Sequence, residues 1–228
     1  MKKFYFIIFL LLIARISYSQ NPCPETPTVP YAGKTYNTVH IGSQCWLKEN
    51  LDVGTRINGI SEQTNNSQIE KYCYADQDTS CTKYGGLYQW AEAVQYQNGA
   101  TNTTLTNPAF TGNVQGICPN GWHIPTNAEY TTLATTVKND GNSLKAVGQG
   151  KGDGLGTNTS GFSALLSGYY IFNQTFNMPL DLGINTNFWS STISNSSGYY
   201  LLIYGNNSMA KTFNQLSEFG FCVRCLND

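Results

Sequence analysis

The fold is decided by the stretch Thr126-Asn127-Ala128-Glu129-Tyr130-Thr131-Thr132-Leu133-Ala134-Thr135-Thr136-Val137. It opens with a capping box, in which the Thr126 hydroxyl accepts a hydrogen bond from the Glu129 N–H and the Glu129 carboxylate reaches back to residue 126. Tyr130, Leu133, Ala134 and Val137 then recur at the spacing of one buried helix face. Asn139-Asp140-Gly141 ends this helix. The sequence patterns before and after this helix differ.

Before this helix, the sequence predicts one hairpin and one further helix. Tyr36–Ile41 and Gln44–Leu47 are β-prone runs on either side of Gly42-Ser43, which is a two-residue hairpin signal. Apolar residues at i, i+3, i+4 and i+7 predict a helix from Gly86 to about Tyr96, ended by Asn98-Gly99: Leu87, Trp90, Ala91 and Val94. Residues 54–70 and 100–116 have the composition of loops.

After this helix, strands dominate. Residues 148–156 alternate glycine with polar residues and predict a flexible loop, because the spacing does not fit a dinucleotide-binding motif. Aromatic and β-branched residues then predict strands at 162–172, 188–192, 199–204, 209–213 and 219–226. Two helices followed by mostly strands predict one loop-rich α+β domain with an antiparallel sheet over residues 31–228.

The N-terminus has the pattern of an export signal. Lys2 and Lys3 precede an apolar run from Phe4 to Ile13, and Ser17 and Ser19 are the small residues that a signal peptidase reads. We expect a signal peptide over residues 1–19, cut before Gln20, with a membrane anchor as the alternative. Residues 20–30 are Pro-rich and predict an extended tether. The mature protein is then expected to lack a membrane span and to be extracellular, on the cell surface or periplasmic.

Composition excludes several classes of protein. The chain has 228 residues, of which 40% are hydrophobic, 13% aromatic and only 12% charged. Residues 1–19 hold three of the thirteen basic residues and no acidic one, so ten basic and fourteen acidic residues remain after them, a formal charge of −4. A mildly acidic, aromatic-rich chain is not typical of a nucleic-acid-binding protein or of a disordered one.

Seven cysteines in an exported chain favour disulfides and leave at least one cysteine free or paired to another chain. Cys73 and Cys81 bracket a short polar loop and form the expected local pair. Cys222-Val223-Arg224-Cys225 has the spacing of a redox motif, but residues three apart on a strand point to opposite faces. Redox motifs of this spacing also open a helix, which lowers the thiol pKa. We therefore expect no redox role here.

Catalytic motifs are scarce. His40 and His123 are the only histidines, and both are expected to be structural. A nucleophilic Cys–His pair stays open because such pairing is spatial. Asp76 with Asp78, and Asp153 with Asn158, offer oxygen ligands for calcium within short loops. Two such residues per loop are few for a tight site, so we expect solvated loop residues and no required cofactor, with calcium as the one alternative.

Binding is the class that the composition favours. The C-terminal half combines rigid aromatic rings with amide and hydroxyl groups, the chemistry of adaptable recognition surfaces and of sugar sites. Half-buried strand tyrosines and turn asparagines are the alternative explanation of the same pattern. The predicted ligand contacts are Trp189, Tyr199, Tyr200, Tyr204, Asn206 and Asn207.

Six segments, in order from about residue 31 to the last residue, carry a family resemblance. They are Val39–Leu51, Tyr84–Trp90, Gly116–Thr126, Gly161–Leu165, Phe188–Thr192 and Gly220–Cys225. With these segments the chain resembles the Fibrobacter succinogenes major paralogous domain, a group of exported bacterial proteins. The resemblance implies a C-type-lectin-like fold related to the formylglycine-generating enzyme scaffold, and it implies no established activity.

The resemblance also bears on the disulfides and on function. It implies a Cys118–Cys225 bond, after which Cys45–Cys222 is the expected third bond, with Cys23 left over. The reactive cysteine pair of the related enzymes has no match in this chain. We therefore expect a non-catalytic, secreted or cell-surface lectin-like module that binds a glycan or a protein. An extracellular enzyme using a free cysteine or a metal, and a structural envelope protein, are the alternatives.

Overall fold

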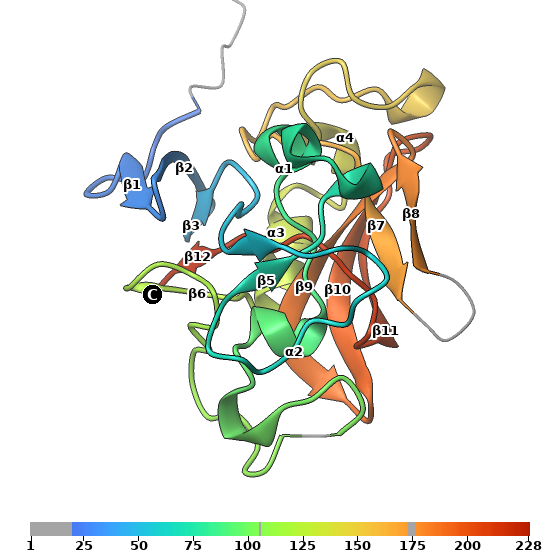
Figure 1. Cartoon of the computed structure of the whole chain (residues 1–228). Coiled ribbons are helices and arrows are strands. Elements are labelled where there is room, and N and C mark those ends of the chain that lie inside the picture. The colour runs from blue at the N-terminus through green and yellow to red at the C-terminus, as the bar shows by residue number, and fades with distance from the viewer. Residues whose placement is uncertain (1–19, 105, 173–176) are drawn as a thin grey trace, which may run out of the picture.

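The computed structural model describes residues 20–104, 106–172 and 177–228, so the predicted signal peptide lies outside the described residues. Figure 1 shows two main sheets, the first at the left and the second at the right. The first has the order β1-β2-β3-β12-β6, with bounds Thr28–Tyr31, Lys34–Ile41, Gln44–Leu47, Leu226–Asn227 and Trp122–His123. The second has the order β11-β10-β9-β7-β8, with bounds Ala210–Leu216, Ser197–Tyr204, Asn185–Ser194, Ser167–Phe172 and Asn177–Leu182. A short parallel pair joins β4 (Thr55–Arg56) to β5 (Glu70–Lys71).

The predicted hairpin is confirmed. β2 and β3 pair antiparallel, with Ile41 opposite Gln44 across the two-residue turn. Gly42 has φ +63°, a conformation that glycine adopts without the clash that a Cβ brings. The Pro-rich segment before it lies on this sheet, because β1 pairs with β2 and both Cys23 and Val29 are buried.

The helix that the capping box predicts is confirmed. α3 spans Asn127–Thr136, and the reciprocal bonds between Thr126 and Glu129 are both present. Its buried residues Tyr130, Leu133 and Ala134 pack α3 against the second sheet. α4 (Gly141–Leu144) follows directly, with Asp140 as its N-cap.

The other predicted helix is wrong over most of its length. Only α2 (Trp90–Ala93) is α-helical within 86–96, followed by a 3-10 turn at Gln97–Gly99. Leu87 and Tyr88 instead pair with Tyr72 and Phe221 as β-bridges. This segment is irregular and is buried on both sides. Its apolar residues therefore repeat over two turns with the period of a helix, although most of it is not helical.

Sequence patterns also missed the helices α1 and α4 and overstated one strand. α1 (Asp78–Tyr84) begins in the loop expected between Cys73 and Cys81 and continues past Cys81. Cys81 is its only buried residue, so no apolar period marks it. Residues 219–226 form isolated bridges and only the short β12. The five strands from β7 to β11 pair antiparallel except between β7 and β9, where Gly168 opposite Thr186 is parallel.

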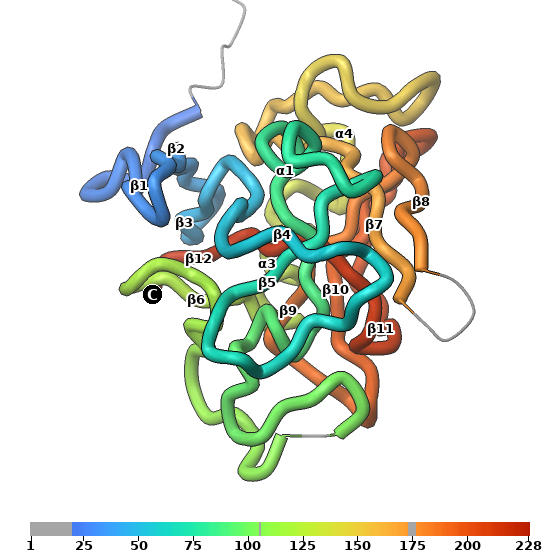
Figure 2. Tube along the Cα trace, viewed as in Figure 1, coloured from blue at the N-terminus to red at the C-terminus, as the bar shows by residue number. Residues whose placement is uncertain are grey.

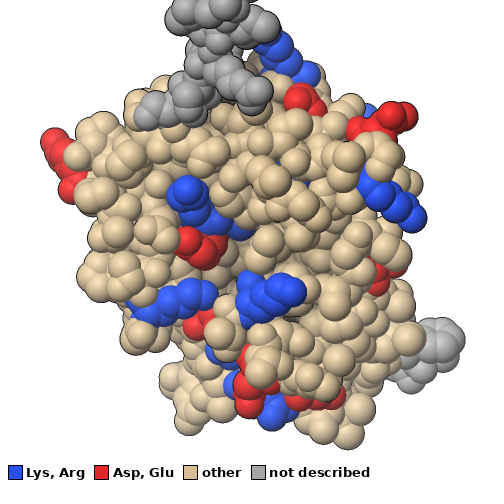
Figure 3. All heavy atoms as spheres, turned by 90° about the horizontal axis from the view of Figure 1, so that it is seen from above, with Lys and Arg blue, Asp and Glu red and all other residues tan. Residues whose placement is uncertain are grey.

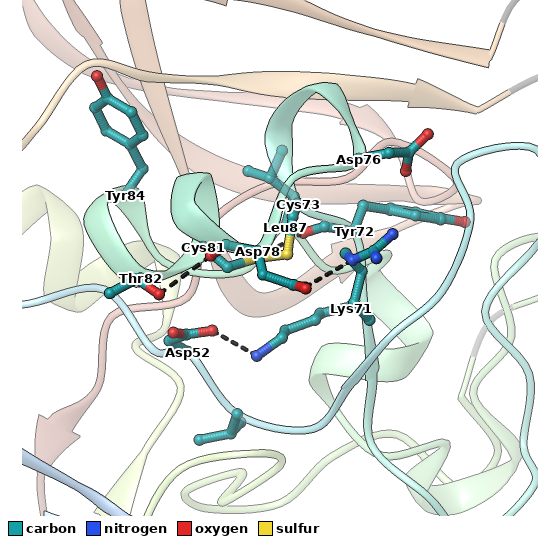
Figure 4. Close-up of a disulfide and its surroundings, with 12 residues drawn as sticks. Asp52, Lys71, Tyr72, Cys73, Asp76, Asp78, Cys81, Thr82, Tyr84 and Leu87 are labelled. Carbon is teal, nitrogen blue, oxygen red and sulfur yellow. Dashed lines mark hydrogen bonds and ion pairs between the residues drawn. A yellow bond between two sulfur atoms is a disulfide. The ribbon is translucent and has the colours of Figure 1, made fainter.

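Three disulfides cross-link the described part of the chain. Cys73–Cys81 and Cys118–Cys225 are present, as predicted. The predicted Cys45–Cys222 bond is wrong: Cys45 bonds to Cys23, and Cys222 is a free, buried thiol. The reason is that Cys23 reaches β3 through the β1–β2 pairing, whereas Cys222 lies deep between Asn50 and Ser167. Figure 4 shows Cys73–Cys81 with the ion pair between Asp52 and Lys71 nearby, whose side chains are 15% and 12% exposed.

The interior holds two apolar clusters. One surrounds Trp90, Trp189 and Phe221, and the other surrounds Trp46, Phe162 and Phe188. Neighbouring residues of β9 and β10 belong to different clusters: Trp189 and Tyr200 to the first, Phe188 and Leu201 to the second. The second sheet therefore lies between the two clusters. Figure 2 shows the path of this last segment, in red, running from the second sheet back to the first.

Candidate ligand-binding site

The second sheet has one face that α3 packs against and one face that carries aromatic and amide side chains. Side chains alternate along a strand, so Tyr200, Leu202 and Tyr204 share a face of β10. The register with β9 sets them opposite Trp189, Asn187 and Asn185. The part of the β9–β10 ladder that assembles the site, from Tyr200 to Tyr204, is regular, and the register shifts only beyond it, between Gly198 and Tyr200.

This face is hollowed into a cavity of about 260 Å³. All five strands of the second sheet, and the segment that follows β11, contribute to its lining. The lining residues are Tyr169, Asp181, Asn185, Asn187, Tyr200, Leu202, Tyr204, Gln215, Phe219 and Phe221. We call this cavity the tyrosine pocket.

Packed aromatic rings form the floor of the tyrosine pocket. Phe221 lies with its ring centroid 4.2 Å from Trp189 and 4.8 Å from Tyr200. Tyr169 packs against Phe219 and Phe221 at 6.1 and 5.9 Å. Aromatic pairs at these separations add to the stability of a site beyond burial alone. The rings of Tyr169 and Tyr200 are therefore held in place before any ligand arrives.

Polar groups converge on the same cavity. Asn187 Nδ2 donates to Asn185 Oδ1 at 3.4 Å, and Asn185 Nδ2 donates to Asp181 Oδ2 at 2.7 Å. Among the described residues, the hydroxyls of Tyr169, Tyr200 and Tyr204 have no protein hydrogen-bond partner. Burial, with the neighbouring Tyr204 and Tyr169, raises the pKa of Tyr200 to about 12, so its hydroxyl keeps its proton. The pocket thus offers both donors and acceptors beside flat rings.

Of the six predicted contacts, the structure brings Tyr200 and Tyr204 into this pocket. Trp189 is fully buried, and its Nε1 donates to Tyr88 O at 2.7 Å, so it supports the floor and cannot touch a ligand. Tyr199 belongs to the other face of β10, because it alternates with Tyr200.

Asn206 and Asn207 lie in the turn between β10 and β11, outside the lining of the tyrosine pocket. Asn207 Oδ1 accepts from the Met209 backbone N–H. The buried Lys145 ammonium donates to Tyr204 O and Asn207 O, which fixes the turn against α4. These asparagines shape the turn, although Asn206 stays exposed at the surface.

The calcium candidates do not converge. Figure 4 shows the side chains of Asp76 and Asp78 pointing in different directions. Asp76 Oδ1 accepts from Gly59 N, and Asp78 Oδ1 pairs with Arg56 Nε at 2.7 Å. Asn158 Oδ1 accepts from Ser163 N, and Asp153 is exposed. Across residues 20–104, 106–172 and 177–228, no group of three His, Cys, Asp or Glu is placed to hold a metal ion.

The free thiol and the histidines lack the geometry of a nucleophile and its base. Cys222 hydrogen-bonds with Asn50 and Ser167, and burial raises its pKa to about 11, so it is a neutral thiol. His40 is exposed on β2. His123 is buried and bonds through Nδ1 to Asp228 at 2.7 Å and through Nε2 to Glu129 at 3.1 Å. It joins the end of β12 to the capping box of α3.

Sequence reasoning missed most of the tyrosine pocket. Asp181, Asn185 and Asn187 come from β8 and β9, and Tyr169 comes from β7. A signal was present: Asn185 and Asn187 alternate with Thr186 and Phe188, which is the pattern of a strand with one polar face. Only the sheet order shows that this face meets the tyrosines of β10.

A family model described as the Fibrobacter succinogenes major domain matches residues 39–227. No curated protein and no solved structure matches the chain. Separately, no helix among the described residues has the length and apolar character needed to cross a membrane.

Proposed function

Because this chain belongs to the Fibrobacter succinogenes major domain family, a match that assigns no activity, we propose from the site itself that the protein is a glycan-binding module. The observation that carries the proposal is the tyrosine pocket, where three tyrosine rings lie beside Asp181, Asn185 and Asn187. Protein ligands, which also use tyrosine-rich surfaces, are the other outcome that the test distinguishes.

The chemistry of the pocket suits a saccharide. A sugar ring has an apolar face of C–H groups and a rim of hydroxyls. Tyrosine faces pack against the former, and the carboxylate and amides hydrogen-bond the latter. A pocket of about 260 Å³ accommodates a terminal sugar residue better than a folded protein surface.

We propose in addition that the module is non-catalytic and exported. The neutral, buried Cys222 thiol and the structural role of His123 support the first part. Three disulfides support the second, because such bonds persist in oxidising compartments. The C-type-lectin-like relationship is part of the same proposal, supported by two curled sheets, few helices and long loops.

A glycan array tests the proposal. The purified disulfide-bonded protein is applied with calcium and again with a chelator, beside the variant Asp181→Asn, which keeps the shape of the pocket and removes its charge. We expect selective binding to a subset of glycans, weakened at least about ten-fold by Asp181→Asn, the cost of a charge-assisted hydrogen bond. Binding of no glycan by folded protein contradicts the proposal and directs the search to protein partners. Loss of signal with chelator shows a calcium requirement.

A further inference from the structure

A second cavity, of about 450 Å³, lies on the side of the molecule where α1 meets the β2–β3 hairpin. Its charged lining is mostly basic: Lys34, Lys48, Lys83 and Arg224, with Glu49 as the only acid. We call it the basic pocket. Figure 3 views the molecule from the α1 side and shows Lys and Arg side chains near the middle of this face, with acidic side chains among them. A ligand would therefore be selected by the pocket and not by a broad field of one sign.

Arg224 is a buried cation that feels the charge of Glu49 but forms no ion pair with it. It is 1% exposed, and its guanidinium packs over the rings of Phe162 and Phe188 at 4.3 and 5.1 Å. Its Nε and Nη2 donate to Asn50 Oδ1, and its Nη1 donates to Phe162 O. These are neutral acceptors, and three of five N–H groups are used by them. Among the described residues Arg224 forms no ion pair.

The one acid in the lining is already engaged. Both Glu49 carboxylate oxygens accept hydrogen bonds from Asn37, one from its backbone N–H and one from its side chain, each at 2.8 Å. The three lysines form no ion pair within the part of the chain that the structure describes. Lys34 and Lys83 lie over the rings of Tyr36 and Tyr84 at 5.2 and 4.8 Å, which keeps their ammonium groups near the pocket. The cavity therefore holds an excess of positive charge.

A buried charge is costly unless an opposite charge or several hydrogen bonds compensate it. Asn50 is held by a second set of bonds, because its Nδ2 donates to Tyr84 O at 2.8 Å and to Cys222 Sγ at 3.2 Å. The amide thus fixes the guanidinium at the wall of the cavity, and the free N–H groups and the lysines remain for a ligand.

We propose that the basic pocket is a binding site for an oxyanion: a sulfate, phosphate or carboxylate group carried by a small molecule or by the end of an acidic chain. Arg224 supplies a planar fork at the wall, and Lys34, Lys48 and Lys83 supply mobile charges at the mouth. The site is separate from the tyrosine pocket, because the two cavities share no lining residue.

The test uses three probes on the purified protein: sodium sulfate, inorganic phosphate and sodium acetate, each titrated calorimetrically at an ionic strength held constant with sodium chloride. The variant is Lys48→Gln with Lys83→Gln, since these partly or fully exposed residues are removed without disturbing the core. Lys151→Gln, at an exposed lysine outside the pocket, is the control for the loss of a surface charge elsewhere. Tyr204→Ala separates this site from the glycan site.

We expect one equivalent of at least one probe to bind, about five-fold or more weaker in the double variant, because two partly or fully exposed charged contacts are lost. Binding should be unchanged in Lys151→Gln and Tyr204→Ala. The probe that binds best identifies the group: sulfate ester, phosphate ester or carboxylate. Absence of saturable binding for all three probes, or equal weakening in Lys151→Gln, overturns the proposal. Neither result bears on the tyrosine pocket.

Discussion

The first sheet is built from strands of two to eight residues, and two disulfides join its strands or the residues next to them. The second sheet is built from strands of six to ten residues, and its described strands hold no disulfide. Short strands form few ladder hydrogen bonds, so covalent bonds replace them in the first sheet. Long ladders hold the second sheet without cross-links, which leaves one of its faces free to carry polar and aromatic residues. The two sheets are therefore held together in different ways, and our glycan-binding proposal rests on the free face of the second sheet.

Removal of the long-range disulfide Cys118–Cys225 should cause the largest loss of stability. The variant Cys118→Ala with Cys225→Ala opens a bond with a sequence separation of 107, which in the chain-entropy model costs about 5 kcal/mol. The variant Cys73→Ala with Cys81→Ala opens a bond with a separation of 8, and the same model gives about 2.5 kcal/mol. Denaturant unfolding without reductant measures both. An equal cost, or a larger one for Cys73–Cys81, contradicts the stabilising role given to Cys118–Cys225 in the first sheet.

Within the second sheet, floor and surface should also differ. Trp189→Ala removes a fully buried ring and its hydrogen bond to Tyr88, for an expected loss of about 3–5 kcal/mol in unfolding free energy. Tyr204→Ala, at a half-buried position on the neighbouring strand, should cost about 1 kcal/mol or less. Urea unfolding of the two variants provides the measurement. A large loss in Tyr204→Ala shows that the tyrosine supports the fold and not only the pocket.

The sequence predicts the features that depend on residues close together along the chain, and it does not predict those that depend on distant residues. The capping box of Thr126 and Glu129 and the Cys73–Cys81 bond are local, and both were predictable from spacing alone. The partner of Cys45 was not, because Cys23 is brought to it by strand pairing between β1 and β2.

The tyrosine pocket was predictable only in part, for the same reason. Tyr200 and Tyr204 have the composition of a recognition surface, but composition does not separate them from the buried Trp189 opposite Tyr200. Asp181 and Tyr169 reach the pocket through sheet order, which depends on contacts between distant segments.

The contact that His123 forms between the two sheets should depend on pH. Its expected effect on the free energy of unfolding is smaller than that of losing a disulfide or Trp189. His123 lies on β6, in the first sheet, and bonds to Glu129 at the start of α3, which covers the second. Burial opposes protonation, but the hydrogen bonds and charges of Glu129 and Asp228 exceed it and raise the pKa of His123. A raised folded-state pKa gives stability that is fully present below the unfolded pKa, about 6.5, and is lost as pH rises through the folded pKa.

The variant His123→Gln measures that contribution. We expect wild type to exceed His123→Gln in unfolding free energy by more at pH 5.5 than at pH 8.5. The difference should be on the order of 1 kcal/mol, because Glu129 and Asp228 are partly solvated. A difference that grows with pH contradicts the assignment of charge to this pair.

The central claim is that one face of the second sheet binds the glycan, and two tyrosines of β10 test it most directly. Tyr204 lines the pocket, and Tyr199, equally half-buried, belongs to the opposite face. The measurement is a glycan array run in parallel with wild type, Tyr204→Ala and Tyr199→Ala, after unfolding curves show that all three are folded. The account predicts that Tyr199→Ala keeps the wild-type pattern and that Tyr204→Ala loses it. Loss in Tyr199→Ala with retention in Tyr204→Ala would contradict the account and move the binding surface to the other face of the sheet.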